Sequence, residues 1–492
     1  MTVISRRAVL TGALAAPVLA AAACSSTATT PSDSEFAALA SSLKGRLLRG
    51  GDVDYLLAAR PTAVRYMQTP AAVAFCTTAN DVQNSLRFAR EHAIPFAVRC
   101  GGHNYAGYST TDGLLIDVRG LTDISYDAAK GLVTIGAGAR NIDTTNALQP
   151  HQVMVPGGRC LSVGVSGLTL GGGWGFYARK YGLTCDKLVE TTAVLADGSL
   201  VTCNAQNNAD LFWAMRGGGG GNFGINTSFT FQPFSTLQPV SVFQLVWYNP
   251  EIAAVIGAFQ DLAVSAPREF SAEIVTSPWQ ASSVKGQNPT VLTVVGQYLG
   301  QPAALRKVLK PLLNAQPPTG AEIRQMSFWE AHQYLTDSTP DDFFAVYSSY
   351  VESVIPAAGL DVIAEHANTW PGSSIPPDSN WGLFVVGGAV NDVPVDATAY
   401  PHRNASMMMK YETSWGHLDS PERIQAGQDW LNAFFKAMQP HVLPQSYVSF
   451  PNRDLPNWQS AYYGPNWDRL VSVKNKYDPD NVFSYGQSIP TH

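Results

Sequence analysis

Three glycine-rich stretches between Arg99 and Phe229 constrain this chain more than any other feature of its sequence. They read RCGGHNYAGYST (99–110), GGRCLSVGVSGLTLGGGWGFYARKYGLTCD (157–186) and RGGGGGNFGINTSF (216–229). Glycine turns let the backbone approach a ligand closely and expose N–H groups that can hold phosphate oxygens. The second and third stretches lack the GK[ST] ending of a P-loop. Three such turns in one region predict a site for a large, extended, anionic cofactor.

The first stretch places His103 directly after two glycines. From the residues alone, this histidine is a surface residue, a metal ligand or a group held against a cofactor.

The segments around these turns predict an α+β domain. AAVAFCTT (71–78) is typical of a buried strand, and PFAVRCGG (95–102) of a second one. Between them, NDVQNSLRFAREHA (80–93) predicts an amphipathic helix with Asn80 or Asp81 near its N-cap. Further on, the DG pair in VETTAVLADGSLVTCNA (189–205) indicates a hairpin. Strand, helix, strand and then hairpins argue against a doubly wound nucleotide fold.

Composition excludes two classes of partner. A chain of 492 residues is long enough for two or three domains. Charged residues make up 14% of it and the formal net charge is -6, whereas a nucleic-acid binder is usually basic. Beyond the N-terminal segment no apolar run approaches the roughly 20 residues of a membrane span. We therefore expect neither a nucleic-acid partner nor a membrane span.

The N-terminal segment MTVISRRAVLTGALAAPVLAAAACSS is typical of an export signal, and Arg6 and Arg7 resemble the twin-arginine type. That route carries folded proteins, which suits a chain that takes up a cofactor before export. Cleavage and secretion is the favoured prediction. Lipid attachment at Cys24 is the alternative, although the usual leucine three residues earlier is missing.

The six cysteines form no close CxxC pair, which argues against a structural zinc site, and no metal site is predicted. If Cys24 is removed or lipidated, five remain, so at least one has no cysteine partner.

The motifs together resemble those of the berberine bridge enzyme-like FAD-linked oxidases, flavoproteins of the vanillyl-alcohol oxidase type. RCGGHNYAGYST resembles that family's R-x-GGH segment, GGRCLSVGV its G-x-C-x-x-VGV segment, and RKYGLTCD its RKYGL-x-xDN segment. The ending DLPNWQSAYYGPNWDRLVSVKNKYDPDNVFSYGQSIP is similar to its C-terminal signature. The likeness covers nearly the whole mature chain.

The resemblance implies an α+β fold with a two-part FAD-binding domain and an α+β substrate domain built on an antiparallel sheet. We expect a signal and low-complexity tether over 1–34, the FAD-binding domain over 35–237, the substrate domain over 238–445, and a C-terminal return to the FAD-binding domain over 446–492.

The resemblance also implies FAD bound through two covalent bonds, one from His103 to the 8α-methyl carbon and one from Cys160 to ring carbon C6. Without it, Cys160 would be taken for an inert buried thiol. The residues predicted to bind the cofactor are Arg99, Gly101, Gly102, His103, Asn104, Gly157, Cys160, Val163, Gly164, Gly167, Gly171, Gly172, Gly224 and Ile225.

On the substrate side the sequence departs from the family. Many members of the family carry a tyrosine base at the second aromatic of a Y-x-N-Y segment, but here that position is Phe450. Plant members carry another active-site tyrosine at the position of Trp174. Neither ring can accept a proton. Either another residue is the base, with Tyr447, Lys410, Tyr400 and Tyr411 as the candidates, or the substrate needs less help from a base. A structural role is the alternative for Lys410 and Tyr447.

The leading functional hypothesis is an exported oxidase that transfers hydride from a small-molecule alcohol, such as a carbohydrate or a natural product, to FAD and passes the electrons to O₂. The alternatives are a dehydrogenase with another acceptor and a flavin-loaded binding protein that has lost catalysis. Val163, three residues after Cys160, matches the family position that controls oxygen access, where valine is typical of oxidases. The alternative for Val163 is an ordinary core residue.

Overall fold

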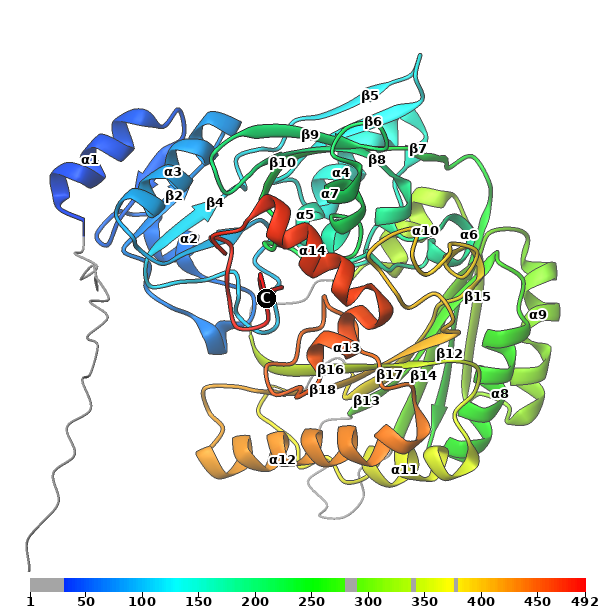
Figure 1. Ribbon diagram of the computed structural model, residues 1–492. Helices are drawn as coiled ribbons and strands as arrows, with labels where there is room; N and C mark the ends of the chain where they lie inside the picture. Colours follow the sequence, from blue (N-terminus) through cyan, green and yellow to red (C-terminus); the bar gives the residue numbers. More distant parts are fainter. Residues whose placement is uncertain (1–30, 279–289, 338–341, 376–378) are drawn as a thin grey trace, which may run out of the picture.

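The computed structural model describes residues 31–278, 290–337, 342–375 and 379–492 (Figure 1). Its strands are β1 (Arg46–Leu48), β2 (Ala72–Phe75), β3 (Phe96–Arg99), β4 (Leu114–Asp117), β5 (Ile124–Asp127), β6 (Leu132–Gly136), β7 (Val153–Met154), β8 (Leu188–Val194), β9 (Leu200–Asn204), β10 (Ile225–Phe231), β11 (Phe234–Ser235), β12 (Val240–Tyr248), β13 (Phe270–Pro278), β14 (Thr290–Tyr298), β15 (Gly320–Met326), β16 (Phe343–Val351), β17 (Trp381–Val385) and β18 (Met407–Trp415). Its α-helices are α1 (Asp33–Ser42), α2 (Tyr55–Ala59), α3 (Ala79–Glu91), α4 (Asn141–Leu148), α5 (Val165–Leu170), α6 (Ala178–Tyr181), α7 (Ala209–Ala214), α8 (Ile252–Ser265), α9 (Pro302–Ala315), α10 (Phe328–Leu335), α11 (Ala357–Ala367), α12 (Pro421–Met438), α13 (Trp458–Tyr463) and α14 (Trp467–Tyr477).

The N-terminal half contains two sheets that share one apolar core. The first has the order β1-β2-β4-β3, with β2, β4 and β3 parallel and β1 antiparallel to β2. The second is antiparallel and has the order β5-β6-β10-β8-β9. The expected hairpin is confirmed, because β8 pairs with β9 across a turn in which Gly198 has a φ of +85°. Parallel and antiparallel sheets side by side make this half α+β, as expected.

The start of helix α3 agrees with the prediction that Asp81 lies near its N-cap. Its N-cap is Thr78, and Asp81 lies in the first turn, where its carboxylate completes a capping box. That carboxylate also accepts hydrogen bonds from the backbone N–H groups of Lys44 and Gly45, at 2.8 and 3.1 Å. Asp81 therefore joins α3 to the start of β1.

The second half is built on one antiparallel sheet of order β15-β12-β14-β13-β17-β18-β16, counted over the described residues. Helices α8, α9, α11 and α12 pack on one face of it, at the side of the molecule away from the first two sheets (Figure 1). Alternate residues of a strand point to opposite faces. On β18, Met407, Met409 and Tyr411 join the core beneath the helices, which leaves Lys410 to face the N-terminal half.

The chain ends against the N-terminal half. In α14, Lys474 is fully buried, where its Nζ donates to the carboxylate of Asp478 at 2.6 Å and to the carbonyl of Asn222 at 2.8 Å. This contact ties the C-terminal segment to the third glycine-rich stretch.

The signal segment with Arg6, Arg7 and Cys24 lies outside the described residues. Helix α1 begins at Asp33, within the expected tether, and Ser32 and Glu35 form a capping box at its start.

The five described cysteines form no disulfide. No helix in the described ranges is long and apolar enough to cross a bilayer.

Candidate active site

A cavity of about 390 Å³ lies between the glycine-rich loops and the face of the large sheet opposite its helices. Most of the predicted site residues line it. They are Gly101, Gly102, His103, Asn104, Cys160, Val163, Gly164, Gly167, Gly171, Gly224, Ile225, Lys410 and Tyr447. The structure thus brings together residues that are more than three hundred positions apart in the sequence.

Two of the glycine-rich loops cross at Gly101 and Gly164. A Cβ on Gly101 would lie 2.3 Å from the backbone nitrogen of Gly164, and a Cβ on Gly164 would lie 2.2 Å from Sγ of Cys100. No larger residue fits at either position without moving backbone. The close crossing is what places His103 and Cys160 on the same wall of the cavity.

His103 and Cys160 share a hydrogen-bond partner. The Oγ of Ser162 lies 2.9 Å from Nε2 of His103 and 3.4 Å from Sγ of Cys160. Both predicted attachment side chains therefore lie around one hydroxyl group.

The third glycine-rich stretch lines a further part of the cavity. Gly219, Gly220, Gly221 and Gly224 line it, and three of them adopt positive φ angles of +85°, +75° and +158° (Gly219, Gly221 and Gly224). Such a turn presents backbone N–H groups without side chains in front of them, which suits the phosphate groups of a dinucleotide. The residues present therefore fit an extended flavin dinucleotide.

Asp337, from the loop after α10, forms backbone hydrogen bonds with the residues on both sides of Cys160. Its backbone N–H donates to the carbonyl of Arg159 at 3.1 Å, and its carbonyl accepts from the N–H of Leu161 at 3.2 Å. Arg159 also forms ion pairs with the carboxylates of Asp337 and Glu273. Burial opposes the positive charge of Arg159, but the two carboxylates outweigh it and raise the pKa of the guanidinium. The second half of the chain thus fixes the loop that carries Cys160.

The substrate end of the cavity carries an ion pair on β18. Nζ of Lys410 lies 2.5 Å from Oε2 of Glu412, and both side chains are about one-sixth exposed, at 16% and 17%. Tyr105 lies at the same end of the cavity, stacked on Phe450 with ring centroids 5.3 Å apart. Burial and the nearby charge of Glu412 both raise the pKa of Tyr105, which therefore stays protonated and able to donate.

Tyr447 points its hydroxyl at the second glycine-rich stretch, where it accepts a hydrogen bond from the N–H of Gly173 at 3.0 Å. Burial raises the pKa of Tyr447, although Ser449 and the N–H groups of Gly173 and Trp174 act in the opposite direction. At neutral pH the Tyr447 side chain is therefore neutral. Trp174 forms part of the cavity wall and donates its indole N–H to the carbonyl of Val385 at 3.2 Å.

Two predicted catalytic residues lie outside the cavity. Tyr411 is fully buried on the opposite face of β18, against Phe434 and Phe435 of α12. Tyr400 lies behind Gly172, and its hydroxyl is 2.8 Å from that of Tyr350. Neither reaches a substrate in the cavity, so a role as base is wrong for both.

Three predicted cofactor residues also need correction. Arg99 is buried and donates to the carbonyls of Ser109 and Ala58, at 2.8 and 2.7 Å, so it holds the loop before His103 instead of lining the cavity. Gly157 and Gly172 are likewise absent from the wall, where Gly158 and Gly171 lie instead. These residues shape the cavity from behind it.

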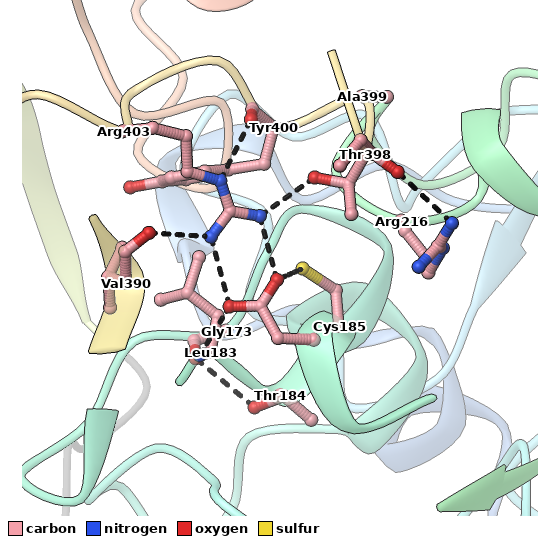
Figure 2. Close-up of polar contacts among 12 residues, drawn as sticks. Gly173, Leu183, Thr184, Cys185, Arg216, Val390, Thr398, Ala399, Tyr400 and Arg403 are labelled. Carbon is pink, nitrogen blue, oxygen red and sulfur yellow. Dashed lines mark hydrogen bonds and ion pairs between the residues drawn. The ribbon is translucent and has the colours of Figure 1, made fainter. Parts of the chain in front are cut away.

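A buried ion pair holds the second glycine-rich stretch against the segment before β18 (Figure 2). The guanidinium of Arg403 bonds both carboxylate oxygens of Asp186, at 2.7 and 3.0 Å, and also the hydroxyl of Thr398 and the carbonyl of Val390. Asp186 accepts the N–H of Leu183 as well. This cluster joins the two halves of the chain next to Tyr400 (Figure 2).

Sequence reasoning missed Glu412, Tyr105, Glu273 and Asp337. The sequence did contain a signal for Glu412: it lies two residues after Lys410 in the same strand, so both side chains point to the same face. Glu273 and Asp337 had none, since only the folded chain brings them to Arg159.

Comparison with known proteins agrees with this geometry. The sequence models of the FAD binding domain and of the berberine and berberine-like family match residues 70–204 and 446–490. The FAD-linked oxidoreductase YgaK of Bacillus subtilis is 33% identical over 460 residues, which cover 91% of this chain and 97% of the relative. The chain belongs to the berberine bridge enzyme-like FAD-linked oxidoreductases.

Two further relatives place this berberine bridge enzyme-like chain within its family. The xylooligosaccharide oxidase of Thermothelomyces thermophilus is 29% identical over 461 residues, covering 88% of this chain and 89% of the relative. The structure of BBE-like 1 from Physcomitrella patens superposes with a TM-score of 0.83, at 30% identity over 93% of this chain and 99% of that one. The protein is therefore an FAD-dependent oxidoreductase with the vanillyl-alcohol oxidase type of fold, and both expectations are confirmed.

Proposed function

We propose that this protein is an exported oxidase that oxidises a carbohydrate hydroxyl, with FAD bound covalently through His103 and Cys160. The observation that carries the proposal is the continuity of one cavity. Its wall at the glycine-rich loops holds both attachment side chains, and its other end holds ionised and hydroxyl groups within reach of a small polar substrate.

A carbohydrate fits the substrate end better than an apolar alcohol. Arg159, Glu273, Lys410 and Glu412 all line the cavity and offer charged donors and acceptors for hydroxyl groups. Trp174 and Phe384 supply apolar ring faces, with centroids 4.8 Å apart, against which a sugar ring can pack. A relative that is 29% identical is named a xylooligosaccharide oxidase.

Bound FAD supplies the acceptor for the hydride that leaves the substrate carbon. Glu412 is the proposed base, because a carboxylate can take the proton of the substrate hydroxyl at neutral pH, whereas neutral Tyr447 cannot. Lys410, paired with that carboxylate, orients it and does not act as a base itself. Tyr105 stays protonated and donates a hydrogen bond to the substrate oxygen.

Oxygen is the proposed electron acceptor, which makes H₂O₂ the second product. Val163 supports this proposal, because its half-buried side chain forms part of the cavity wall instead of an interior core. A residue at the wall can control whether a small molecule reaches the bound flavin.

Export rests on Arg6 and Arg7, which resemble the twin-arginine signal. Secretion after cleavage is the proposed outcome, and attachment to the cell envelope through a lipid on Cys24 is the alternative.

An anaerobic titration tests the proposed chemistry. The purified protein is mixed with monosaccharides, oligosaccharides and apolar alcohols, and the visible absorbance of the flavin is followed. We expect a carbohydrate to bleach the flavin, and admitted oxygen to restore the absorbance with formation of H₂O₂. Bleaching by apolar alcohols alone would overturn the carbohydrate assignment, and slow recovery in air would identify a dehydrogenase.

A further inference from the structure

Ser162 lies between the two predicted attachment residues, His103 and Cys160. Its hydroxyl is the only side-chain group with a recorded hydrogen bond to both His103 and Cys160 among the described residues, at 2.9 and 3.4 Å. A hydroxyl can accept from one neighbour and donate to another at the same time. The two contacts are therefore compatible with one directed chain of hydrogen bonds.

The contact with His103 selects a tautomer. If Ser162 accepts a hydrogen bond from Nε2–H, a neutral imidazole carries its proton on Nε2 and its lone pair on Nδ1. A histidine can attack a carbon atom only through a nitrogen with a lone pair. With this direction of the hydrogen bond, Ser162 prepares Nδ1 of His103 as the nucleophile.

The same hydroxyl then has its proton available for Cys160. A donor within reach of Sγ stabilises the thiolate, which is the nucleophilic form of cysteine. When Ser162 accepts from Nε2–H of His103, its own hydrogen is available to the sulfur. One side chain therefore favours the reactive form of both attachment residues.

We propose that Ser162 is a positioning residue for flavin attachment, which prepares His103 and Cys160 together for bonding to FAD. The proposal rests on the covalent attachment in the proposed function. Each bond joins a protein atom to a flavin carbon and removes one hydrogen from each. The two electrons and two protons pass to the isoalloxazine ring and from there to O₂, which becomes H₂O₂.

The neighbouring structure leaves this hydroxyl little freedom. Asp337 fixes the peptide units on both sides of Cys160, and the crossing of Gly101 and Gly164 fixes the loop of His103. The backbone thus brings the two anchors together, and the hydroxyl contacts both of them. Removing the hydroxyl should slow attachment without separating the loops.

The test separates the two bonds by using single-anchor backgrounds. In Cys160→Ala protein any attached flavin reports on His103, and in His103→Ala protein it reports on Cys160. Ser162→Thr and Ser162→Val are introduced into each background, since these side chains have similar shapes and differ in the hydroxyl. Ser472→Val is the matched control, because Ser472 is exposed on α14 and its Oγ bonds the carbonyl of Asp468 and neither anchor.

The measurement is the fraction of full-length chains that carry flavin after acid precipitation, read by intact mass at set times after synthesis with excess FAD. We expect Ser162→Val to slow attachment at least about tenfold in both backgrounds, which corresponds to the loss of one well-placed hydrogen bond. Ser162→Thr and Ser472→Val should keep the rates of their parent backgrounds.

Three results would overturn the role of Ser162. They are unchanged attachment in Ser162→Val, slowing in only one background, and equal slowing in Ser162→Val and Ser162→Thr, which would indicate a packing defect. Release of all flavin from the unaltered protein is a different result, because it would disprove covalent attachment itself.

Discussion

Lys410 and Glu412 have different roles although they lie on the same face of β18. Their ion pair places a carboxylate in the cavity, next to protonated Tyr105. An ammonium group has no lone pair to receive a proton, so the carboxylate is the proposed base. The assignment makes one side chain responsible for the step that starts substrate oxidation.

Changing Glu412→Gln keeps the shape of that side chain and removes its basicity. We expect the rate of anaerobic flavin reduction by substrate to fall by about 10²- to 10⁴-fold, the usual contribution of a general base. Stopped-flow absorbance measures that rate. Glu322→Gln, the same change at an exposed position on β15, is the control and should be neutral. A Glu412→Gln protein that reduces its flavin at the parental rate would move the role to another residue.

Val163 tests the oxygen reaction separately. Leucine adds one methylene to a wall that is closely packed, so Val163→Leu should narrow the path of O₂ to the flavin. We expect reoxidation to slow at least about tenfold, or about 1.4 kcal/mol in the barrier. Reduction by substrate should stay unchanged, and stopped-flow traces of the two half-reactions measure both. Equal reoxidation rates in parent and variant would exclude Val163 as the gate.

Among the elements, α3 shows how one carboxylate can hold several segments. Asp81 accepts hydrogen bonds from backbone N–H groups of its own cap and of the chain before β1. Burial disfavours the charge, but these hydrogen bonds outweigh it and lower the pKa of Asp81. Because the folded pKa lies below the unfolded one, this group stabilises the fold above the unfolded pKa, and the stabilisation is lost as the pH falls through the folded pKa.

Asp81→Asn should therefore destabilise the protein at neutral pH by about 1–3 kcal/mol. The difference in unfolding free energy between parent and variant should shrink as the pH falls below about 4, where an unfolded aspartate is protonated. Thermal unfolding across that pH range measures it. Asp396→Asn, at an exposed position, is the control. A difference that does not change with pH would show that the charge of Asp81 is not what matters.

Elements with strong local signals were predictable from the sequence. Helix α3, strands β2 and β3 and the β8–β9 hairpin agree with the periodicity and the DG turn. The N-cap residue itself, Thr78, was not predictable. Thr78, Asn80 and Asp81 are all residue types that cap helices well, and only the tertiary contacts of Asp81 decide between them.

The face of a strand was harder to predict than the strand. Tyr411 lies next to Lys410 in the sequence, but it packs beneath α12, because a shift of one residue reverses the face. The ion pairs of Arg159 with Glu273 and Asp337 depend on contacts between distant segments, for which a single sequence gives no pattern.

At the scale of the whole molecule, the two halves are joined by buried polar contacts as well as apolar ones. Arg403 pairs with Asp186 (Figure 2), and Arg179 donates to the carbonyls of Ala263 and Val386, at 3.2 and 2.8 Å. Removing one member of a buried ion pair typically costs about 3–5 kcal/mol, because the other charge stays buried without compensation. The joint between the halves is therefore a stable part of the fold.

The export of the folded molecule can be tested with a paired change. Arg6→Lys and Arg7→Lys together keep the positive charge of the segment but remove the proposed signal for the folded-protein route. We expect the protein to accumulate inside the cell, measured by fractionation and immunoblotting. The control is Lys44→Arg, a change of the same kind in the mature chain. Undiminished export of the double variant would indicate the general secretory route.

The contact between Asp337 and the chain around Cys160 has a mechanical consequence. Any hinge motion between the halves would break two backbone hydrogen bonds and the Arg159–Asp337 ion pair directly beside Cys160. Substrate should therefore enter the cavity, and product leave it, through an opening of fixed width, without separation of the two halves. A long sugar chain would then enter with one end first, and residues in the middle of such a chain would escape oxidation.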